Sequence, residues 1–172
     1  MAADYQFYQT TGATPGVDTP QGIGNGSNDW DFKSNGDPGK ATAADTIRAG
    51  DYSYHVYVRG RFTQPTSGVQ FSSITNVKYY GSNINLSGYG NGSAIYESGT
   101  TVYAEPSNTG MSGVWSPIPQ VSASGIDIST ADLAAGTPGW TDWVAIQLKT
   151  GAINAGTGFQ GFQQFTIIYD EV

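Results

Sequence analysis

A run of alternating apolar and polar residues at positions 51–62 constrains the fold more than any other part of the sequence. In an extended chain its apolar residues share one face, namely Tyr54, Val56, Val58 and Phe62. The opposite face carries Ser53, His55, Tyr57, Arg59 and Arg61. β-Branched and aromatic residues fit a pleated strand that is buried on one face only. The run therefore predicts a half-buried strand whose apolar face needs a second layer to cover it.

Further segments of the chain predict strands, with Gly, Pro, Asn and Ser residues between them. They are residues 4–9, 69–80, 84–86, 94–97, 100–105, 143–149 and 162–172. Ser98 and Gly99 predict a break between two of these strands, and a change of apolar phase predicts a bend near Ser72 and Ser73. Roughly eight short strands are typical of a jelly roll. The sequence thus predicts an all-β fold, a jelly-roll-like β-sandwich.

One short helix and one edge segment are expected beside these strands. Residues 129–136 combine capping hydroxyls, an acidic first turn and a closing Gly, which predicts a helix of one or two turns. Pro117 and Pro119 cannot donate to a ladder, so the segment around them must be an edge or a loop. The expected core comprises Tyr54, Val56, Val58, Phe62, Ile74, Val77, Val144, Ile146, Leu148, Phe165 and Ile167.

The chain divides near residue 50 into two parts of different character. Residues 51–172 predict the β-sandwich domain, whereas residues 1–50 predict a first strand followed by a long irregular segment, either an extended arm or a wrapped loop. Such a long segment without periodicity is usually functional. Its aromatic anchors are the predicted assembly contacts, namely Tyr5, Phe7, Tyr8, Trp30 and Phe32. We expect this part to contribute to assembly more than to the fold of its own subunit.

The charge balance and the absence of cysteine exclude several classes of protein. Seven Lys and Arg residues against fourteen Asp and Glu give a net charge of −7, so neither nucleic acid nor an anionic membrane is an expected partner. With no cysteine, disulfides and thiolate chemistry are excluded. The first residues lack the basic and apolar regions of a signal peptide, so we expect synthesis in a cytoplasm.

Catalytic residue types are scarce in this chain. His55 is the only histidine, so a serine triad and a histidine-based zinc site each lack a key member. Carboxylates are present, but no pair of them lies in a recognisable glycosidase motif. The sequence therefore predicts a protein that is not an enzyme.

One loop offers oxygen ligands of the kind that calcium prefers. Asp29, Asp31 and Asp37 lie close together in the sequence among Asn and Gly residues. Lys33 stands where a further ligand would be expected, and the alternative is that these side chains bond their own backbone in Asx turns. We expect no cofactor, with calcium at these aspartates as the open alternative.

The strand pattern of residues 52–54, 56–62, 71–80 and 165–171 resembles the β-sandwich auxiliary proteins of tailed viruses, which decorate or cement a capsid. This resemblance covers about two-thirds of the chain as a pattern of strands. It implies a subunit that binds the capsid or another structural protein, forms a homo-oligomer such as a trimer, and resides on the virion surface. The alternative from another class is a carbohydrate-binding module of jelly-roll type, which also carries aromatic residues in its turns.

Overall fold

The computed structural model of the protein shows an all-β fold, with no helix in the part of the chain that it describes. That part comprises residues 4–20, 32–37, 42, 44–48, 50–64, 73–82, 93–100, 103–110, 116–119, 125–128, 133–134, 139–150 and 164–172. The strands form a seven-stranded sheet and a four-stranded sheet, called sheet A and sheet B below. Every strand pairing in both sheets is antiparallel.

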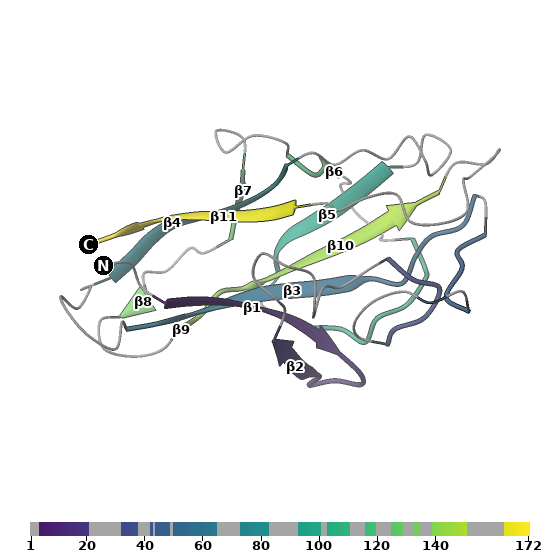
Figure 1. Ribbon diagram of the computed structural model, residues 1–172, viewed down its shortest axis with the longest axis horizontal. Coiled ribbons are helices and arrows are strands. Elements are labelled where there is room, and N and C mark those ends of the chain that lie inside the picture. Colours follow the sequence, from purple (N-terminus) through teal and green to yellow (C-terminus); the bar gives the residue numbers. More distant parts are fainter. Residues whose placement is uncertain are drawn as a thin grey trace.

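Each sheet combines strands from distant parts of the sequence (Figure 1). Sheet A contains β1 (Asp4–Thr11), β2 (Val17–Pro20), β3 (Val56–Thr63), β5 (Ser93–Thr100), β6 (Ser116–Pro117), β9 (Gly139–Trp140) and β10 (Trp143–Lys149). Its order is β2-β1-β3-β10-β5-β6, with β9 also beside β3. Sheet B contains β4 (Ser73–Ser82), β7 (Ile126–Asp127), β8 (Leu133–Ala134) and β11 (Gln164–Glu171). Its order is β11-β4-β7, with β8 also beside β4.

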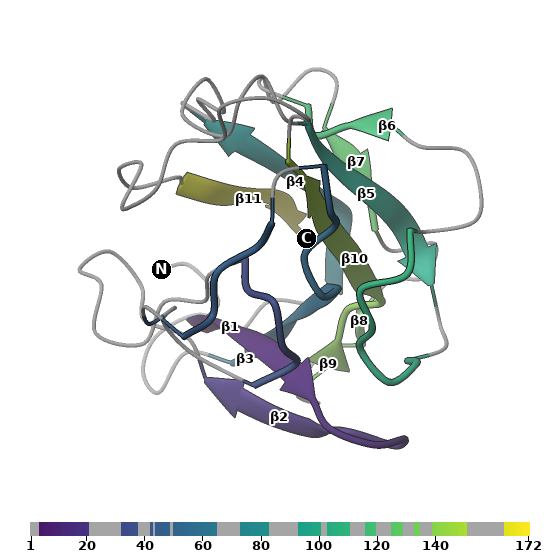
Figure 2. The ribbon, with the colours of Figure 1, turned by 90° about the vertical axis from the view of Figure 1, so that its right-hand side faces the viewer.

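The two sheets pack face to face through one hydrophobic core, which confirms the β-sandwich. Sheet A contributes Val56, Val58, Phe62, Val144 and Ile146 to this core, and sheet B contributes Ile74, Val77, Tyr79 and Ile126. Figures 1 and 2 show β4 and β11 on one side of this core and β1, β3 and β9 on the other. The jelly-roll type of the sandwich stays a prediction.

The alternation on which the prediction of β3 rests is confirmed. Val56, Val58 and Phe62 are buried in the core, while Arg59 and Arg61 lie on the opposite face. The predicted core positions Ile74, Val77, Val144, Ile146 and Leu148 are also buried. Tyr54 and Ile167 are only partly buried, and the side chain of Phe165 lies outside the described residues.

The predicted break at Ser98 and Gly99 is a β-bulge inside a continuous strand. Trp143 pairs with Thr100 and Ala145 pairs with Glu97, so Ser98 and Gly99 together lie opposite one residue of β10. A bulge of this kind accommodates an extra residue and bends the strand without ending it. Two predicted strands are therefore a single one, β5, and the expected strand at residues 100–105 does not continue beyond Thr100 in the described residues.

The bend predicted near Ser72 and Ser73 lies further along β4. Asn76 adopts a positive φ of 51°, and the register between β4 and β11 shifts at this point. Asn is one of the few residues that tolerate this conformation. Its Nδ2 donates a hydrogen bond of 2.6 Å to Oδ2 of Asp170 on β11, which links the two strands across the irregularity.

The prediction of a helix at residues 129–136 is wrong for the two of these residues that the structure describes. Leu133 and Ala134 form the short strand β8, which pairs with Ser73 and Ile74. Pairing with the sheet outweighs the helical preference of these two residues, since propensity alone is a weak determinant. The predicted edge is confirmed, because Pro117 lies in β6 at the end of sheet A.

The N-terminal strand belongs to sheet A. β1 lies between β2 and β3, and its residues Tyr5 and Phe7 pack against the core. Further along, residues 32–37 and 44–48 have no regular secondary structure. Phe32 also packs against the core, and the backbone N of Tyr54 donates a hydrogen bond of 2.8 Å to the carbonyl of Lys33. The described parts of residues 1–50 are therefore wrapped onto their own sandwich.

Gly60 in β3 permits the close approach of the Tyr5 ring. A Cβ atom added at Gly60 would lie 2.4 Å from Cε2 of Tyr5, far inside the contact distance. We expect Gly60→Ala to lower the free energy of unfolding by about 1 to 3 kcal/mol, the usual cost of overpacking a core. Denaturant titration measures this loss. Restoration of stability in the double variant with Tyr5→Leu would support the steric cause, and wild-type stability of Gly60→Ala would contradict it.

Because some of its tyrosines are buried, we expect the protein to lose stability in alkali. Burial raises the pKa of Tyr79 to about 12, despite its hydrogen bonds with Thr141 and Tyr5. The unfolded chain ionises near pH 10, so the folded state binds more protons between these two pKa values and stability falls as pH rises. Two pH units correspond to about 2 to 3 kcal/mol. Burial also raises the pKa of Tyr5 well above its ordinary value, which adds to the effect.

The measurement is the urea midpoint at a series of pH values between about 9 and about 11.5. We expect the midpoint to be constant at the start of this range and to fall steadily above pH 10. Tyr79→Phe should lower the starting stability through its lost hydrogen bonds but flatten the alkaline decline. A midpoint that stays constant across the whole range would contradict the raised pKa of Tyr79 in the folded state.

Candidate interaction surface

The outer face of sheet A, which is turned away from sheet B, is divided into a covered half and an open half. In the covered half Tyr57 and Ala145 pack against Tyr103 and are almost fully buried. The amide of Gln147 donates hydrogen bonds to the carbonyls of Ser53 (2.7 Å) and Thr109 (3.1 Å), so residues 103–110 are fixed over this end.

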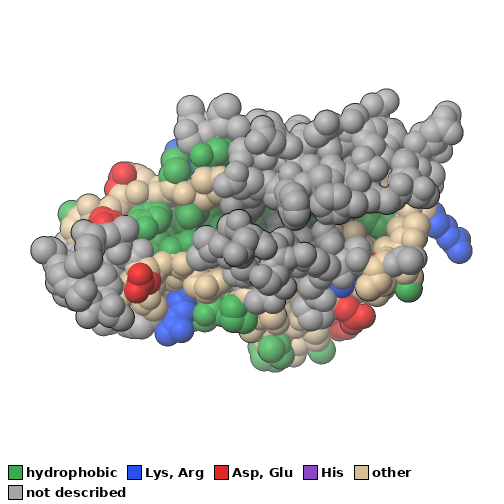
Figure 3. Space-filling model, viewed as in Figure 1, with side chains coloured by type: hydrophobic (Ala, Val, Ile, Leu, Met, Phe, Trp, Pro, Cys, Tyr) green, Lys and Arg blue, Asp and Glu red, His purple; other side chains and the backbone are tan. Residues whose placement is uncertain are grey.

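The open half carries what we call the aromatic–arginine patch, which consists of Tyr8, Asp18, Arg59, Arg61, Trp140 and Trp143. Strand register brings these residues together, because Tyr8 of β1 pairs with Arg59 and Trp140 of β9 pairs with Arg61. Trp140 is 37% exposed, which leaves part of its ring open to a partner. Figure 3 shows hydrophobic and basic side chains over β1, β2 and β9 on the lower side of the molecule.

Arg59 is the centre of this patch. Its guanidinium carbon lies 4.1 Å from the ring centroid of Trp140 and 4.2 Å from that of Trp143. The same guanidinium forms an ion pair with the carboxylate of Asp18, through both Nε and Nη2. Cation–π contacts and a two-point ion pair each hold the side chain in one position.

A short chain of hydrogen bonds connects the ring of Trp143 to this ion pair. The indole Nε1 of Trp143 donates to Oγ1 of Thr10 (2.9 Å), and that hydroxyl donates to Oδ1 of Asp18 (2.6 Å). On the other side of the patch, the ring of Tyr8 makes an edge contact with Trp140 at a centroid distance of 4.8 Å. The patch thus links five strands of sheet A, namely β1, β2, β3, β9 and β10.

Arg61 differs from Arg59 in having no carboxylate partner in the part of the chain that the structure describes. The ion pairs between described residues are Arg59–Asp18 and Lys78–Asp127. Nε of Arg61 is buried and has no hydrogen-bond partner among the described residues, while its guanidinium carbon lies 5.7 Å from the ring centroid of Trp140. A buried donor of this kind costs free energy unless a partner satisfies it.

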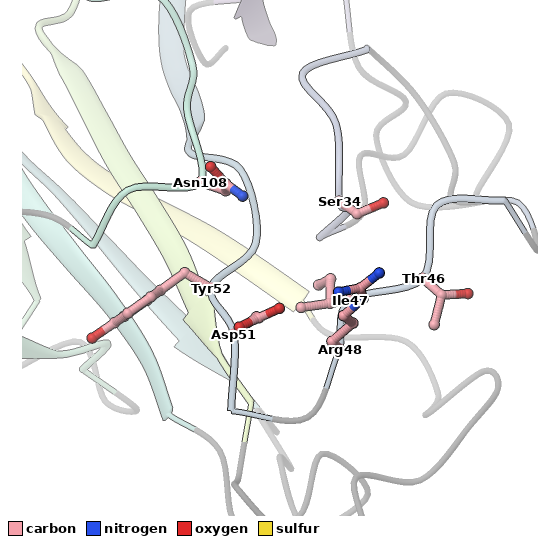
Figure 4. Close-up of a pocket in the computed structure, with 7 residues that line it drawn as sticks. All are labelled: Ser34, Thr46, Ile47, Arg48, Asp51, Tyr52 and Asn108. Atoms are coloured by element: carbon pink, nitrogen blue, oxygen red, sulfur yellow. The ribbon is translucent and has the colours of Figure 1, made fainter.

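A shallow depression of about 230 Å³ lies at the other end of the sandwich (Figure 4). It is lined by Ser34, Thr46, Ile47, Arg48, Asp51, Tyr52 and Asn108. In Figure 4 the side chains of Tyr52 and Thr46 point in opposite directions, away from the centre of the group. The lining groups do not converge on one point, as the polar groups of a ligand site do.

The structure places the predicted assembly contacts in different surroundings. Tyr5, Phe7 and Phe32 pack against the core of their own chain, whereas Tyr8 is part of the aromatic–arginine patch. Trp30 lies outside the described residues. A role of these residues in assembly stays a prediction, with Tyr8 the one that lies on the open surface.

Part of the proposed calcium loop is described, and there the structure shows hydrogen bonds typical of turns. The backbone N of Asp37 donates to Oδ1 of Asn35 (3.2 Å), which is the Asx pattern. Asp29 and Asp31 lie outside the described residues, and no group of three metal-ligating side chains occurs within them. Asp45 also organises this region, since hydrogen bonds from Thr42 and Asn35 lower the pKa of its carboxyl.

Three residues of the patch were not singled out from the sequence, namely Asp18, Trp140 and Trp143. The sequence contains one relevant signal, because the polar face of the strand at residues 51–62 carries two arginines and the chain has two tryptophans three positions apart. Only the register of β3 with β9 and β10 shows that these groups meet.

Comparisons of the chain with models of protein families, with curated proteins and with solved structures gave no match. Among the described residues, no helix has the length and hydropathy that a membrane crossing requires.

Proposed function

We propose that the protein is a structural subunit of a virus particle, a capsid decoration or head auxiliary protein that binds the shell and neighbouring copies of itself. It is a binding subunit and not an enzyme. The aromatic–arginine patch is the observation that supports this proposal best. Trp, Tyr and Arg are enriched among the residues that contribute most of the energy in protein interfaces, and here they gather on the half of the outer face of sheet A that residues 103–110 do not cover.

The arrangement of the rings favours a protein partner over the alternative, a carbohydrate. A sugar stacks on an aromatic ring whose face is open. In the patch, the guanidinium of Arg59 covers one face of Trp140 and one face of Trp143, and Tyr8 contacts Trp140 as well. The two indoles and Tyr8 thus form, with Arg59, a shaped amphipathic surface that suits the side chains of a protein.

Mass spectrometry of purified particles tests this function. Virus particles from the source culture are banded in a density gradient, and the peptides of each band are quantified. We expect this protein in the particle band at a copy number comparable to that of the shell subunit, and antibody-gold labelling on the heads. Its absence from the particles, combined with binding to a glycan array, would replace the proposal with the carbohydrate-binding alternative.

A further inference from the structure

We propose that the aromatic–arginine patch binds the outer face of β11 in a second copy of this chain, with Arg61 of one copy paired with Asp170 of the next. This inference deepens the proposed function, since it assigns the contact between neighbouring subunits. It rests on the chemistry of two surfaces of the same protein and is tested without a virus particle.

The first surface carries one arginine, Arg61, that has no carboxylate partner among the described residues. Arg61 has a buried Nε without a hydrogen-bond partner and no carboxylate in reach among the described residues, although its neighbour Arg59 is fully paired with Asp18. Beside Arg61 lie the exposed ring of Trp140 and the ring of Tyr8. A matching partner therefore presents a carboxylate flanked by apolar side chains.

The outer face of β11 has this composition. Successive side chains of a strand alternate between its faces, so Ile168, Asp170 and Val172 share one face, while Ile167 and Tyr169 pack against the core. Ile168 is 36% exposed and Val172 is 66% exposed, with the acidic Asp170 between them. We call Ile168, Asp170 and Val172 the β11 strip. Its C-terminal end is held in place, because Val172 exchanges two backbone hydrogen bonds with Ser73.

The two surfaces lie on opposite sides of the molecule. The patch is on the outer face of sheet A, and the strip is on the outer face of sheet B, as Figure 1 shows for β9 and β11. One chain cannot join its own patch to its own strip, so the contact requires a second copy. A contact between two different surfaces is head-to-tail and closes into a ring when the rotation between copies permits it. Three copies joined in this way would form the trimer that the resemblance implies.

Light scattering after size-exclusion chromatography, followed by sedimentation velocity over a concentration series, tests this contact with the full chain. We expect the wild type to have a mass that is a multiple of 18.1 kDa. Arg61→Glu and Asp170→Arg should each weaken association by about tenfold or more, as expected when one partner of an interfacial ion pair is lost. The combined variant, with the charges exchanged, should restore association.

Matched controls separate the contact from effects on folding. Arg48→Glu introduces the same charge change at an exposed position away from the patch and should leave the mass unchanged. Asp170→Asn keeps an acceptor for Asn76 and should weaken association through the lost charge alone. Circular dichroism melts of Arg48→Glu and Asp170→Asn should equal that of the wild type, whereas Asp170→Arg also loses the hydrogen bond from Asn76 and is therefore judged by the rescue in the combined variant. A wild type of 18.1 kDa at every concentration, or single variants that are not rescued by the charge exchange, would overturn this contact, whereas the function is judged separately from the particle composition.

Discussion

Removal of residues 1–48 is expected to abolish the cooperative unfolding transition of the protein. The deletion removes both β1 and β2 from the edge of sheet A beside β3, and with them the core contacts of Tyr5, Phe7 and Phe32. Loss of one large buried aromatic side chain typically costs about 3 to 5 kcal/mol. Tyr5 and Phe7 are partly buried, so each contributes less than this, but the pairing of β1 with β3 is lost as well. The combined loss is large beside the stability of an ordinary domain, which is about 5 to 15 kcal/mol.

Circular dichroism melts and size-exclusion chromatography show the outcome directly. The matched control is removal of residues 1–3, which precede β1 and should leave the melt unchanged. This expectation reverses the one drawn from the irregular sequence of residues 1–50, which predicted that this part contributes to assembly more than to the fold of its own subunit. A truncated chain that stays soluble and melts cooperatively near the wild-type temperature would show that β1 contributes little to the sandwich.

Truncation of Phe62 is expected to have the second largest effect. The Phe62 side chain is fully buried, and its ring contacts Tyr5 at a centroid distance of 5.0 Å and Tyr169 of sheet B at 4.7 Å. Phe62→Ala opens a cavity at the point where the two sheets meet. We expect a loss of about 3 to 5 kcal/mol and a decrease in melting temperature of roughly 10 °C or more.

The neighbouring residue provides the control for this measurement. Thr63 lies on the opposite face of the same strand, and its hydroxyl donates only a long, exposed hydrogen bond of 3.4 Å to the carbonyl of Asp4. Thr63→Ala should change stability by less than about 0.5 kcal/mol, as is usual for surface positions. Equal losses in the two variants would show that the face of β3 is assigned incorrectly.

The alternation of residues along a strand is local information, and it predicted which faces are buried. In β3 and β10 the apolar positions Val58 and Val144 were expected in the core, and both are buried and paired with each other. A residue in an antiparallel strand turns its side chain to the same face as its partner. The alternation within each strand was therefore sufficient to predict most of the residues that form the core.

Register between distant strands is not local information, and the patch depends on it. Arg59 meets Trp140 and Trp143 because β9 and β10 follow one another along β3. Nothing in the spacing of these residues specifies that alignment. For the same reason Asp18 could not be assigned to Arg59, since the pairing of β2 with β1 decides where this carboxylate lies.

The patch has a further consequence for the way in which a partner associates. Cation–π contacts, an ion pair and the hydrogen bonds of Trp143 and Thr10 immobilise its side chains in the subunit itself. Ordering a long side chain at an interface usually costs about 0.5 to 1.5 kcal/mol. At Arg59 and the two indoles this rotamer freedom is already lost when the chain folds, so docking there leaves the surface almost unchanged in shape. Association through this face should therefore be close to rigid-body docking.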